Sequence, residues 1–502
     1  MEYSMSTEEN MNFSKADIIF AFAMLPCGFL YWNLLDSYKL GAGVTVFAAV
    51  IFSASFVYMS KSGYRQNVKS LVCLILAALC SVQFLLFDNQ FISYLNLVFL
   101  TGLFIYWICL STGRHMDKKL SVYMIGDGVK QVIYMPFMNF SCCAVGIKKY
   151  FSGQREGRGI IAALVGVLIF LPLLAAVVNL LVSADRAFEN FIDEFCGLIN
   201  FFTLTKYIRQ FIFGIPVAFY LYGLLYGNIL GRHDEKVTAR TFDRAANFIK
   251  VAPRLTIYGA LTAFNIVYLV FFAVQAAYLF SAFGGTLPEA FTYAEYARRG
   301  FFELCAVAGI NLVVLTISYM TIKREAGEEP MALRAEIVII SVFTMLLIAT
   351  ALSKMAMYIS AYGLTQLRVF TSWFMILLLL VFLIIFVRQF IRFNSARSII
   401  VVFVTMFMIL SYGNADGNIA KYNIARYEAG TLATLDIDAL SELSAAAVPH
   451  IYGLYMRTDK NEYVLSQRLK RVINMSAKPG GETGFRGFNI QDFKADEIRV
   501  IL

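Results

Sequence analysis

A succession of eleven long apolar runs limits what this chain of 502 residues can fold into more than any other feature of its sequence. Most of the runs have 18 or more residues, the length that an α-helix needs to cross the hydrocarbon core of a bilayer. Charged residues make up 15% of the chain, whereas a typical soluble domain has about 25%. The runs cover about 18–35, 42–60, 70–87, 91–111, 159–182, 208–230, 255–281, 301–322, 336–358, 369–391 and 397–412. The sequence therefore predicts an all-α integral membrane protein with about 11 transmembrane helices.

The basic residues of the loops indicate the orientation of these helices. The N-terminal segment and every second loop after it hold 24 lysines and arginines, and the opposite loops hold 8. Basic residues concentrate in the cytoplasmic loops of membrane proteins. We therefore expect the N-terminus to lie in the cytoplasm. After an odd number of spans, the C-terminal segment is expected to be extracytoplasmic.

The hydrophobic pattern divides the chain into three regions. Residues 1–158 contain about four spans and a basic cytoplasmic loop, and residues 159–412 contain about seven spans. The tail, residues 413–502, is predicted to be a small, mainly helical, soluble region with a possible surface for a protein partner. It has 11 basic and 11 acidic residues, so the formal charge of +9 resides in the loops between spans. This distribution favours contact with the lipid bilayer and argues against nucleic acid.

The basic loop contains a stretch over 123–150 that is apolar in part but too short to span. It joins the run Val132–Phe140 to Lys130, Lys148 and Lys149. Apolar residues beside lysines are typical of an amphipathic segment that lies among the lipid headgroups. A re-entrant loop that lines a cavity is the alternative.

An acidic row follows the predicted fifth span. Asp185, Glu189 and Asp193 are spaced by four residues, so they share one face of a helix whose other face is apolar. Three neighbouring carboxylates could bind a hard cation. A solvated outer face is the simpler interpretation.

Polar residues form a stripe on the predicted seventh span. Tyr258, Thr262, Asn265, Tyr268 and Gln275 fall within roughly 140° of the helix circumference. Polar groups inside a bilayer require partners, so this stripe is expected to face other helices.

The predicted eighth span has a matching stripe that begins in the segment before it. Tyr296, Gly300, Glu303 and Asn311 share one face if the helix is continuous. Arg299 lies four residues before Glu303, a spacing that allows an ion pair. Glu303 is a structural anchor in the simpler interpretation and a substrate or proton site in the functional one. The candidates for a polar cavity or substrate site are Glu303, Arg299, Asn311, Asn265, Gln275 and Tyr296.

Two further features concern helix packing. Gly223, Gly227 and Gly231 recur every four residues on the sixth span and predict the close approach of another helix. Lys354, near the outer end of the ninth span, is expected to extend its amine to the membrane surface. A pair with an acid of another helix is the alternative.

Motifs for nucleotide, metal or nucleophilic chemistry are absent from the sequence. It lacks a P-loop, a G-x-G-x-x-G motif after a strand, and an H-E-x-x-H motif. His115, His233 and His450 are its only histidines, and their spacing fits no catalytic triad. We therefore predict no cofactor, no metal and no catalytic residue, and the sequence favours a protein that is not an enzyme.

A block of aromatic and charged residues stands at the mouth of the eighth span. It reads Tyr293-Ala-Glu-Tyr-Ala-Arg-Arg-Gly-Phe-Phe-Glu-Leu304. Further blocks are Ser183-Ala-Asp185, Tyr422–Tyr427, Leu435–Ser444 and Phe485–Asn489. Over about residues 160–502 these blocks resemble a bacterial family of polytopic membrane proteins of unknown function. The resemblance implies a multi-pass protein of the bacterial cytoplasmic membrane with an outer tail, and it implies no activity.

Three classes of function agree with these features. A transporter or channel-like protein fits the paired polar stripes, and its substrate would be an ion or a small molecule. An envelope enzyme that acts on a lipid-linked substrate is an alternative, with an outer carboxylate as general base. A membrane sensor or scaffold that uses the tail is the third.

Overall fold

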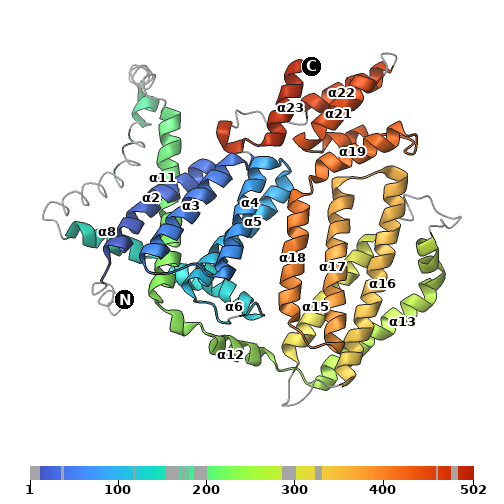
Figure 1. Ribbon diagram of the computed structural model, residues 1–502, viewed down its shortest axis with the longest axis horizontal. Helices are drawn as coiled ribbons and strands as arrows, with labels where there is room; N and C mark the ends of the chain where they lie inside the picture. The colour runs from blue at the N-terminus through green and yellow to red at the C-terminus, as the bar shows by residue number, and fades with distance from the viewer. Residues whose placement is uncertain are drawn as a thin grey trace.

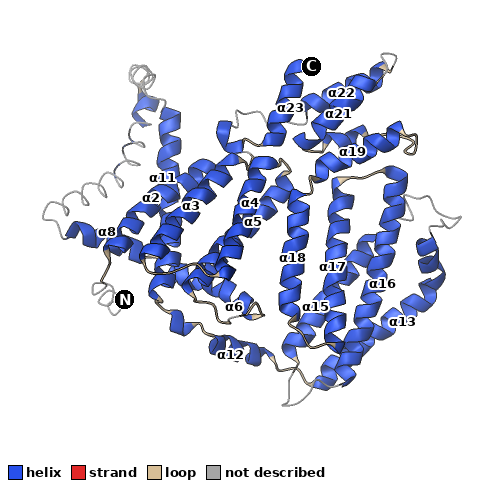
Figure 2. Ribbon diagram, in the orientation of Figure 1, coloured by secondary structure: helices blue, strands red, loops and turns tan. Residues whose placement is uncertain are grey.

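The protein folds into helices throughout the part of the chain that the structure describes. The computed structural model describes residues 12–35, 39–117, 119–152, 170, 174, 177, 180–185, 201–284, 301–322, 331–458, 462–475 and 484–502. Every regular element within these ranges is a helix, as Figure 2 shows.

Ten helices of these ranges are long and apolar enough to cross a membrane. In chain order they are α2 (Lys15–Leu35), α3 (Ala42–Lys61), α4 (Val68–Leu86), α5 (Gln90–Thr112), α11 (Phe201–Leu230), α13 (Arg254–Gly284), α15 (Phe301–Thr321), α16 (Met331–Tyr362), α17 (Gln366–Phe390) and α18 (Ser395–Tyr412) (Figure 1). They coincide with ten of the eleven predicted runs, which confirms the multi-pass helical class. The remaining run, 159–182, lies outside the described residues except for helical positions 170, 174, 177 and 180–182.

Short polar side chains determine where four of these helices begin. Asn67, Asn89, Thr365 and Asn394 each accept a hydrogen bond from the backbone N–H three residues further on. A cap of this kind satisfies an N–H group that the first turn of a helix leaves unpaired. The apolar runs therefore become helices with defined starts at α4, α5, α17 and α18.

A first bundle consists of α2, α3, α4, α5 and α11 around one hydrophobic core. The backbones of α2 and α11 meet at Gly28 and Gly214, where a Cβ added to Gly28 would lie 2.1 Å from the Gly214 carbonyl oxygen. Trp107, Tyr222 and Phe84 are fully buried among the helices of this bundle. Because α11 belongs to this core, the core extends beyond residue 158, where the sequence analysis placed a regional boundary.

The stretch over 123–150 packs against α11. It folds as α6 (Tyr123–Val129), a π-helical turn (Lys130–Tyr134), α7 (Met135–Met138) and α8 (Cys142–Ser152). The predicted glycine ridge of α11 receives it: a Cβ on Gly223 would lie 2.5 Å from the Pro136 carbonyl oxygen, and one on Gly227 would lie 2.5 Å from Asn139 Nδ2. Phe137, on the other face, is 60% exposed. One side of the stretch is thus part of the bundle, and the other faces outward.

A second bundle consists of α13, α15, α16 and α17 around a separate core. α18 connects the two bundles, because it packs on α17 and also contacts α4 and α5. The rings of Phe99 on α5 and Phe407 on α18 lie 4.8 Å apart. Tyr412 at the end of α18 donates a hydrogen bond to the Leu79 carbonyl of α4.

The tail forms a third, smaller core. Its elements are α19 (Ala415–Glu428), α20 (Ile437–Ser441), a 3₁₀ turn (Ala445–Ala447), α21 (Val448–Arg457), α22 (Tyr463–Met475), a second 3₁₀ turn (Gly484–Gly487) and α23 (Ile490–Ile501). The prediction of a mainly helical tail is confirmed. Asn423 of α19 anchors the tail to the second bundle: its side chain accepts from Leu364 N at 2.7 Å and donates to Leu364 O at 2.8 Å.

The connections alternate between two ends of the bundles. The tail face is the end where the tail meets residues 39–41, 87–89 and 363–365. The basic face is the opposite end, with α6, α12 (Ala239–Ile249) and the turn 391–394. There Asn394 donates to the Leu120 carbonyl at 2.8 Å, and Lys130 forms an ion pair with Asp234. The described connections therefore lie on the sides that a regular series of crossings requires.

Candidate functional site

The two polar stripes that the sequence indicates meet inside the second bundle. Tyr268 of α13 donates its hydroxyl proton to Asn311 Oδ1 of α15. Asn311 Nδ2 in turn donates to Thr344 Oγ1 of α16 at 2.8 Å, and the Thr344 hydroxyl donates to the Ile340 carbonyl at 2.6 Å. Tyr268, Asn311 and Thr344 are all buried. Three helices are therefore cross-linked by one chain of hydrogen bonds in the middle of the bundle.

A second layer of the same helices lies nearer the basic face. Glu336, in the second turn of α16, accepts hydrogen bonds from Thr262 Oγ1 at 2.6 Å and from Asn265 Nδ2. Asn265 is buried, and its Oδ1 atom has no hydrogen-bond partner among the described residues. Sequence reasoning did not single out Glu336, although it is the first residue of the predicted ninth run and the only acid in it. The polar seam comprises these six residues, Thr262, Asn265, Tyr268, Asn311, Glu336 and Thr344.

Two charged side chains lie towards the tail-face ends of α15 and α16. Lys354 of α16 is half-buried, and Glu303 lies in the first turn of α15. Glu303 itself is exposed and lies apart from the buried face of Asn311, whereas the sequence stripe placed the two on one face.

The other candidate residues are placed only in part. Arg299 and Tyr296 lie outside the described residues, and so do Glu189 and Asp193 of the acidic row. Gln275 belongs to α13, but its side chain is outside the described part of the chain. Asp185 is exposed and follows a helical stretch over 180–184.

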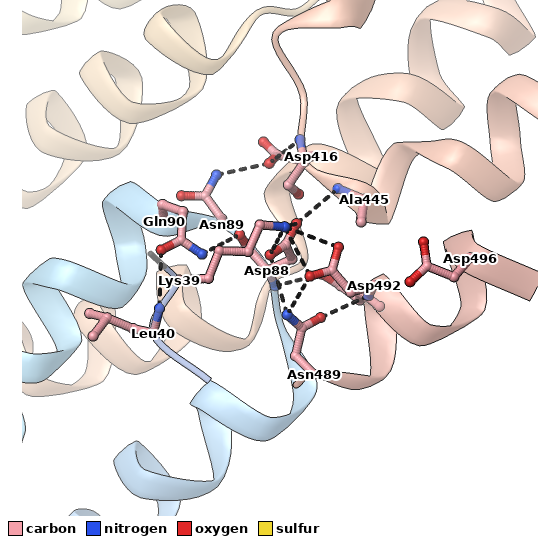
Figure 3. A network of polar contacts seen from close by, with 12 residues as sticks. Lys39, Leu40, Asp88, Asn89, Gln90, Asp416, Ala445, Asn489, Asp492 and Asp496 are labelled. Carbon is pink, nitrogen blue, oxygen red and sulfur yellow. Dashed lines mark hydrogen bonds and ion pairs between the residues drawn. The ribbon is translucent and has the colours of Figure 1, made fainter. Parts of the chain in front are cut away.

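A buried ion cluster under the tail is the second polar site (Figure 3). Lys39, from the loop after α2, binds Asp88 at 3.0 Å and Asp492 of α23 at 2.9 Å. Asn489 Nδ2 donates to both carboxylates at 3.2 Å, and Ala445 N donates to Asp88 Oδ2 at 3.2 Å. The tail cluster, Lys39, Asp88, Asn489 and Asp492, therefore fastens the first bundle to the end of the chain.

Burial and charge act in opposite directions within this cluster. Burial raises the pKa of Asp88, and the neighbouring carboxylate of Asp492 adds to this effect, while Lys39 opposes it. Burial lowers the pKa of Lys39, but the two carboxylates outweigh burial and raise it. Lys39 therefore stays charged, and Asp88 takes up a proton at a higher pH than an ordinary aspartate.

Asp416 of α19 connects the tail with both bundles. Its carboxylate accepts from Asn89 Nδ2 of the first bundle and from Gln366 Nε2 of the second, each at 2.9 Å. It also accepts from Ser444 N of the tail at 3.1 Å. A cavity of about 10 Å³ lies beside it, enough for one water molecule. Pairing between residues so distant in sequence leaves no local pattern, and sequence reasoning missed this site and the tail cluster.

These features define the class of protein. Ten apolar helices of the described ranges, a polar seam inside one of their two bundles and a helical tail fastened across both make this a multi-pass α-helical membrane protein. The chain belongs to the family described as domain of unknown function DUF4153, whose model matches residues 72–454. The match begins within α4, earlier than the resemblance over 160–502 indicated, and ends before the block Phe485–Asn489. No curated protein and no solved structure matches the chain.

Proposed function

We propose that this protein moves a small ion across the membrane along the polar seam between α13, α15 and α16. The observation that carries the proposal is the arrangement of ionisable and polar groups along α16. Glu336 stands near one end of this helix, Thr344 in the middle and Lys354 near the other end. Ionisable residues in membrane helices are costly and commonly mark the path of an ion or a proton.

The spacing of these residues fits a path through a bilayer. Glu336 and Lys354 are 18 positions apart, which corresponds to five helical turns, so they lie on the same side of α16. At about 1.5 Å per residue they are separated by roughly 27 Å along the helix axis. The hydrocarbon core of a bilayer is about 30 Å thick. One charged group therefore stands at each boundary of the membrane, with the hydrogen-bonded layer of Asn311 between them.

The middle layer corresponds to a closed state of such a path. Asn311 has 0% exposure, and it bonds to helices on both sides. An ion could pass only if α13, α15 and α16 separate enough to break these bonds. Asn311 is in this proposal the residue that holds the path closed.

The distribution of basic residues supports an orientation for the transport path. The loops of the basic face carry most of the lysines and arginines between the spans. The basic face is cytoplasmic in the proposal, with the N-terminus inside and the tail outside a bacterial cytoplasmic membrane. The mouth at Glu336 then opens to the cytoplasm.

The experiment uses the full chain in sealed liposomes loaded with fluorescent indicators for H⁺, Na⁺, K⁺ and Cl⁻. Asn311→Ala removes two hydrogen bonds, each worth about 1 kcal/mol net. If the closed state loses this stabilisation, the open population rises by up to about 30-fold. We expect flux of at least one of these ions to rise by that order relative to the unmodified protein.

Thr316→Ala is the matched control, because Thr316 lies on the same helix and is exposed. Among the described residues, its hydroxyl bonds only to the Leu312 carbonyl of its own helix. This variant should leave flux unchanged. Both variants must elute and melt as folded protein. Flux at the level of empty liposomes in the unmodified protein and in folded Asn311→Ala would contradict the proposal.

A sensor or scaffold that uses the tail is the second candidate, and the position of Asp416 favours it. Because Asp416 bonds to Asn89, Gln366 and Ser444, a shift of either bundle would displace the tail. If the protein is a sensor or scaffold, cells with Asp416→Ala should show the phenotype of cells that lack the protein. Cells with Asn311→Ala should not show it. Loss with Asn311→Ala alone excludes this candidate.

A further inference from the structure

α12 is a short helix outside the membrane-spanning elements, between α11 and α13 on the basic face (Figure 1). Thr238 begins it with a capping box, in which Thr238 and Thr241 exchange side-chain hydrogen bonds. One side is held by α6: Tyr123 donates its hydroxyl proton to Asp243 Oδ1 at 2.8 Å, and the rings of Tyr123 and Phe242 lie 5.5 Å apart. The helix therefore has a fixed position rather than a free one.

Apolar side chains at the C-terminal end of α12 and the start of α13 are largely uncovered by the rest of the described chain. Phe248 is 84% exposed, Val251 73%, Leu255 81% and Ile249 42%. The side chains of Phe248, Val251 and Leu255 therefore have few contacts with the rest of the described chain. Such a cluster in water would be costly, about 25 cal/mol for each Å² of apolar surface.

Basic residues surround this apolar cluster. Arg240, Arg244, Lys250 and Arg254 lie in the same segment, whose single acid, Asp243, is engaged by Tyr123. Arg240 and Arg244 are exposed, and they are spaced by one helical turn. A cationic segment with uncovered apolar side chains is complementary to a surface that is anionic outside and apolar just beneath.

The chain holds this segment at the membrane surface. α11 ends at Leu230 and α13 begins at Arg254, so both flanks of α12 are membrane-spanning helices. The link between α12 and α13 is also fixed to the end of α15, because Ala252 N donates to the Thr321 carbonyl at 3.0 Å. The segment is thus confined to the depth where lipid headgroups lie.

We infer that α12 and its link to α13 bind the surface of a leaflet that contains anionic lipid. Arg240, Arg244 and Lys250 contact the lipid phosphates, and Phe248 and Val251 enter the apolar layer below them. Each basic residue near such a surface strengthens the attraction about fivefold. This inference is independent of the transport proposed above, since none of these residues belongs to the polar seam.

The test measures where Phe248 resides and which lipid surrounds it. The Phe248→Trp variant of the full chain is reconstituted into vesicles of phosphatidylcholine in which about 30% of the lipid is anionic phosphatidylglycerol. Two preparations are compared, one with brominated acyl chains on phosphatidylglycerol and one with brominated acyl chains on phosphatidylcholine. Bromine quenches tryptophan fluorescence on contact. The signal of the added tryptophan is the difference from the parent protein, which contains three tryptophans. We expect brominated phosphatidylglycerol to quench it at least fivefold more per mole than brominated phosphatidylcholine.

Charge removal supplies the second arm. Arg240→Gln, Arg244→Gln and Lys250→Gln together should abolish the preference for phosphatidylglycerol and leave quenching by phosphatidylcholine. The control removes three exposed basic residues of the tail, by Arg468→Gln, Arg471→Gln and Lys494→Gln, and should leave the preference intact. In the Val98→Trp variant, at a position of α5 that is 73% exposed, both lipids should quench equally.

Two results would overturn the inference. Absence of quenching by both lipids would place Phe248 outside the bilayer. Equal quenching by both lipids, unchanged by the three glutamine substitutions, would reduce the segment to an apolar anchor without selectivity for anionic lipid.

Discussion

Lys39, in the loop after the first membrane helix, forms a buried ion pair with Asp492, 453 positions later in the chain. Asp88 shares the same ammonium group, so one lysine neutralises two carboxylates that approach each other under the tail. This cation joins the tail to the first bundle, in addition to the hydrogen bonds that Asn89 and Asp88 form with the tail.

Removal of the cation should release the tail. Lys39→Met keeps the length of the side chain but leaves Asp88 and Asp492 without their partner, and breaking a buried pair in this way typically costs about 3–5 kcal/mol. We expect a much faster cleavage of the tail by a protease added on that side, with little change in the membrane bundle. Lys494→Met is the control, because Lys494 is exposed on the same helix. Equal cleavage of the two variants would show that the cluster does not hold the tail.

Mild acid should strengthen the same attachment. The pKa of Asp88 is raised by burial and by Asp492 when the tail is docked, so the docked state binds the proton more tightly than the released state. The resulting stabilisation is complete below the ordinary aspartate pKa of about 3.9 and is lost as the pH rises through the raised value. Protease resistance of the tail should therefore fall as the pH rises from about 3.9 through the raised pKa of Asp88. Asp88→Asn should remove this slope, and an unchanged slope in that variant would show that Asp88 is not its source.

Close contact between two backbones makes Gly28 irreplaceable. A Cβ at this position would lie 2.1 Å from the Gly214 carbonyl oxygen, and no flexible side chain is there to move away. Gly28→Ala should lower the stability by at least the roughly 1–3 kcal/mol typical of an overpacked core, seen as a lower melting temperature in detergent. Gly102→Ala, with nothing within 4 Å of the added methyl group, should be neutral or slightly stabilising. A neutral Gly28→Ala would mean that α2 and α11 are further apart than described.

Asp416 should couple the two bundles energetically. Asn89 and Gln366 both donate to its carboxylate, although they belong to different bundles. Asn89→Ala and Gln366→Ala should therefore be non-additive in a double-mutant cycle on thermal stability, with a coupling of about 0.5–3 kcal/mol. The coupling should vanish in the Asp416→Ala background. Additive losses would indicate that the bundles are stabilised independently.

Local patterns predicted most of the membrane architecture, because hydropathy is a property of contiguous residues. The ten described spans agree with the predicted runs, with ends that differ by at most seven residues. Periodicity also placed Asn265 and Asn311 on buried faces, and the four-residue spacing of Gly223 and Gly227 predicted close packing. The partner of this ridge is the stretch around Pro136 and not another span, which spacing alone could not specify.

Contacts between distant segments could not be predicted in the same way. Glu336 joins Asn265 and Thr262 across 71 and 74 positions of sequence, and its partners depend on how α13 lies against α16. In the sequence Lys39 and Asp416 resemble ordinary loop and helix residues, and only the docking of the tail on the bundles brings their partners to them. The prediction that Glu303 shares the buried face of Asn311 was wrong. Hydropathy does not determine how far a helix is rotated about its axis, so the edge of the buried face could not be placed from the sequence.

The pairing of Lys39 with Asp492 also sets an order of events during synthesis. At about 5–20 residues per second, a ribosome needs roughly 20–90 s to reach Asp492 after it has made Lys39. Throughout that interval the loops after α2 and α4 hold a lysine and an aspartate whose common partner does not yet exist. A chain that stops before Asn489 keeps its membrane helices but never completes the cluster. The late segment that carries Asn489 and Asp492 thus decides whether the cluster can form.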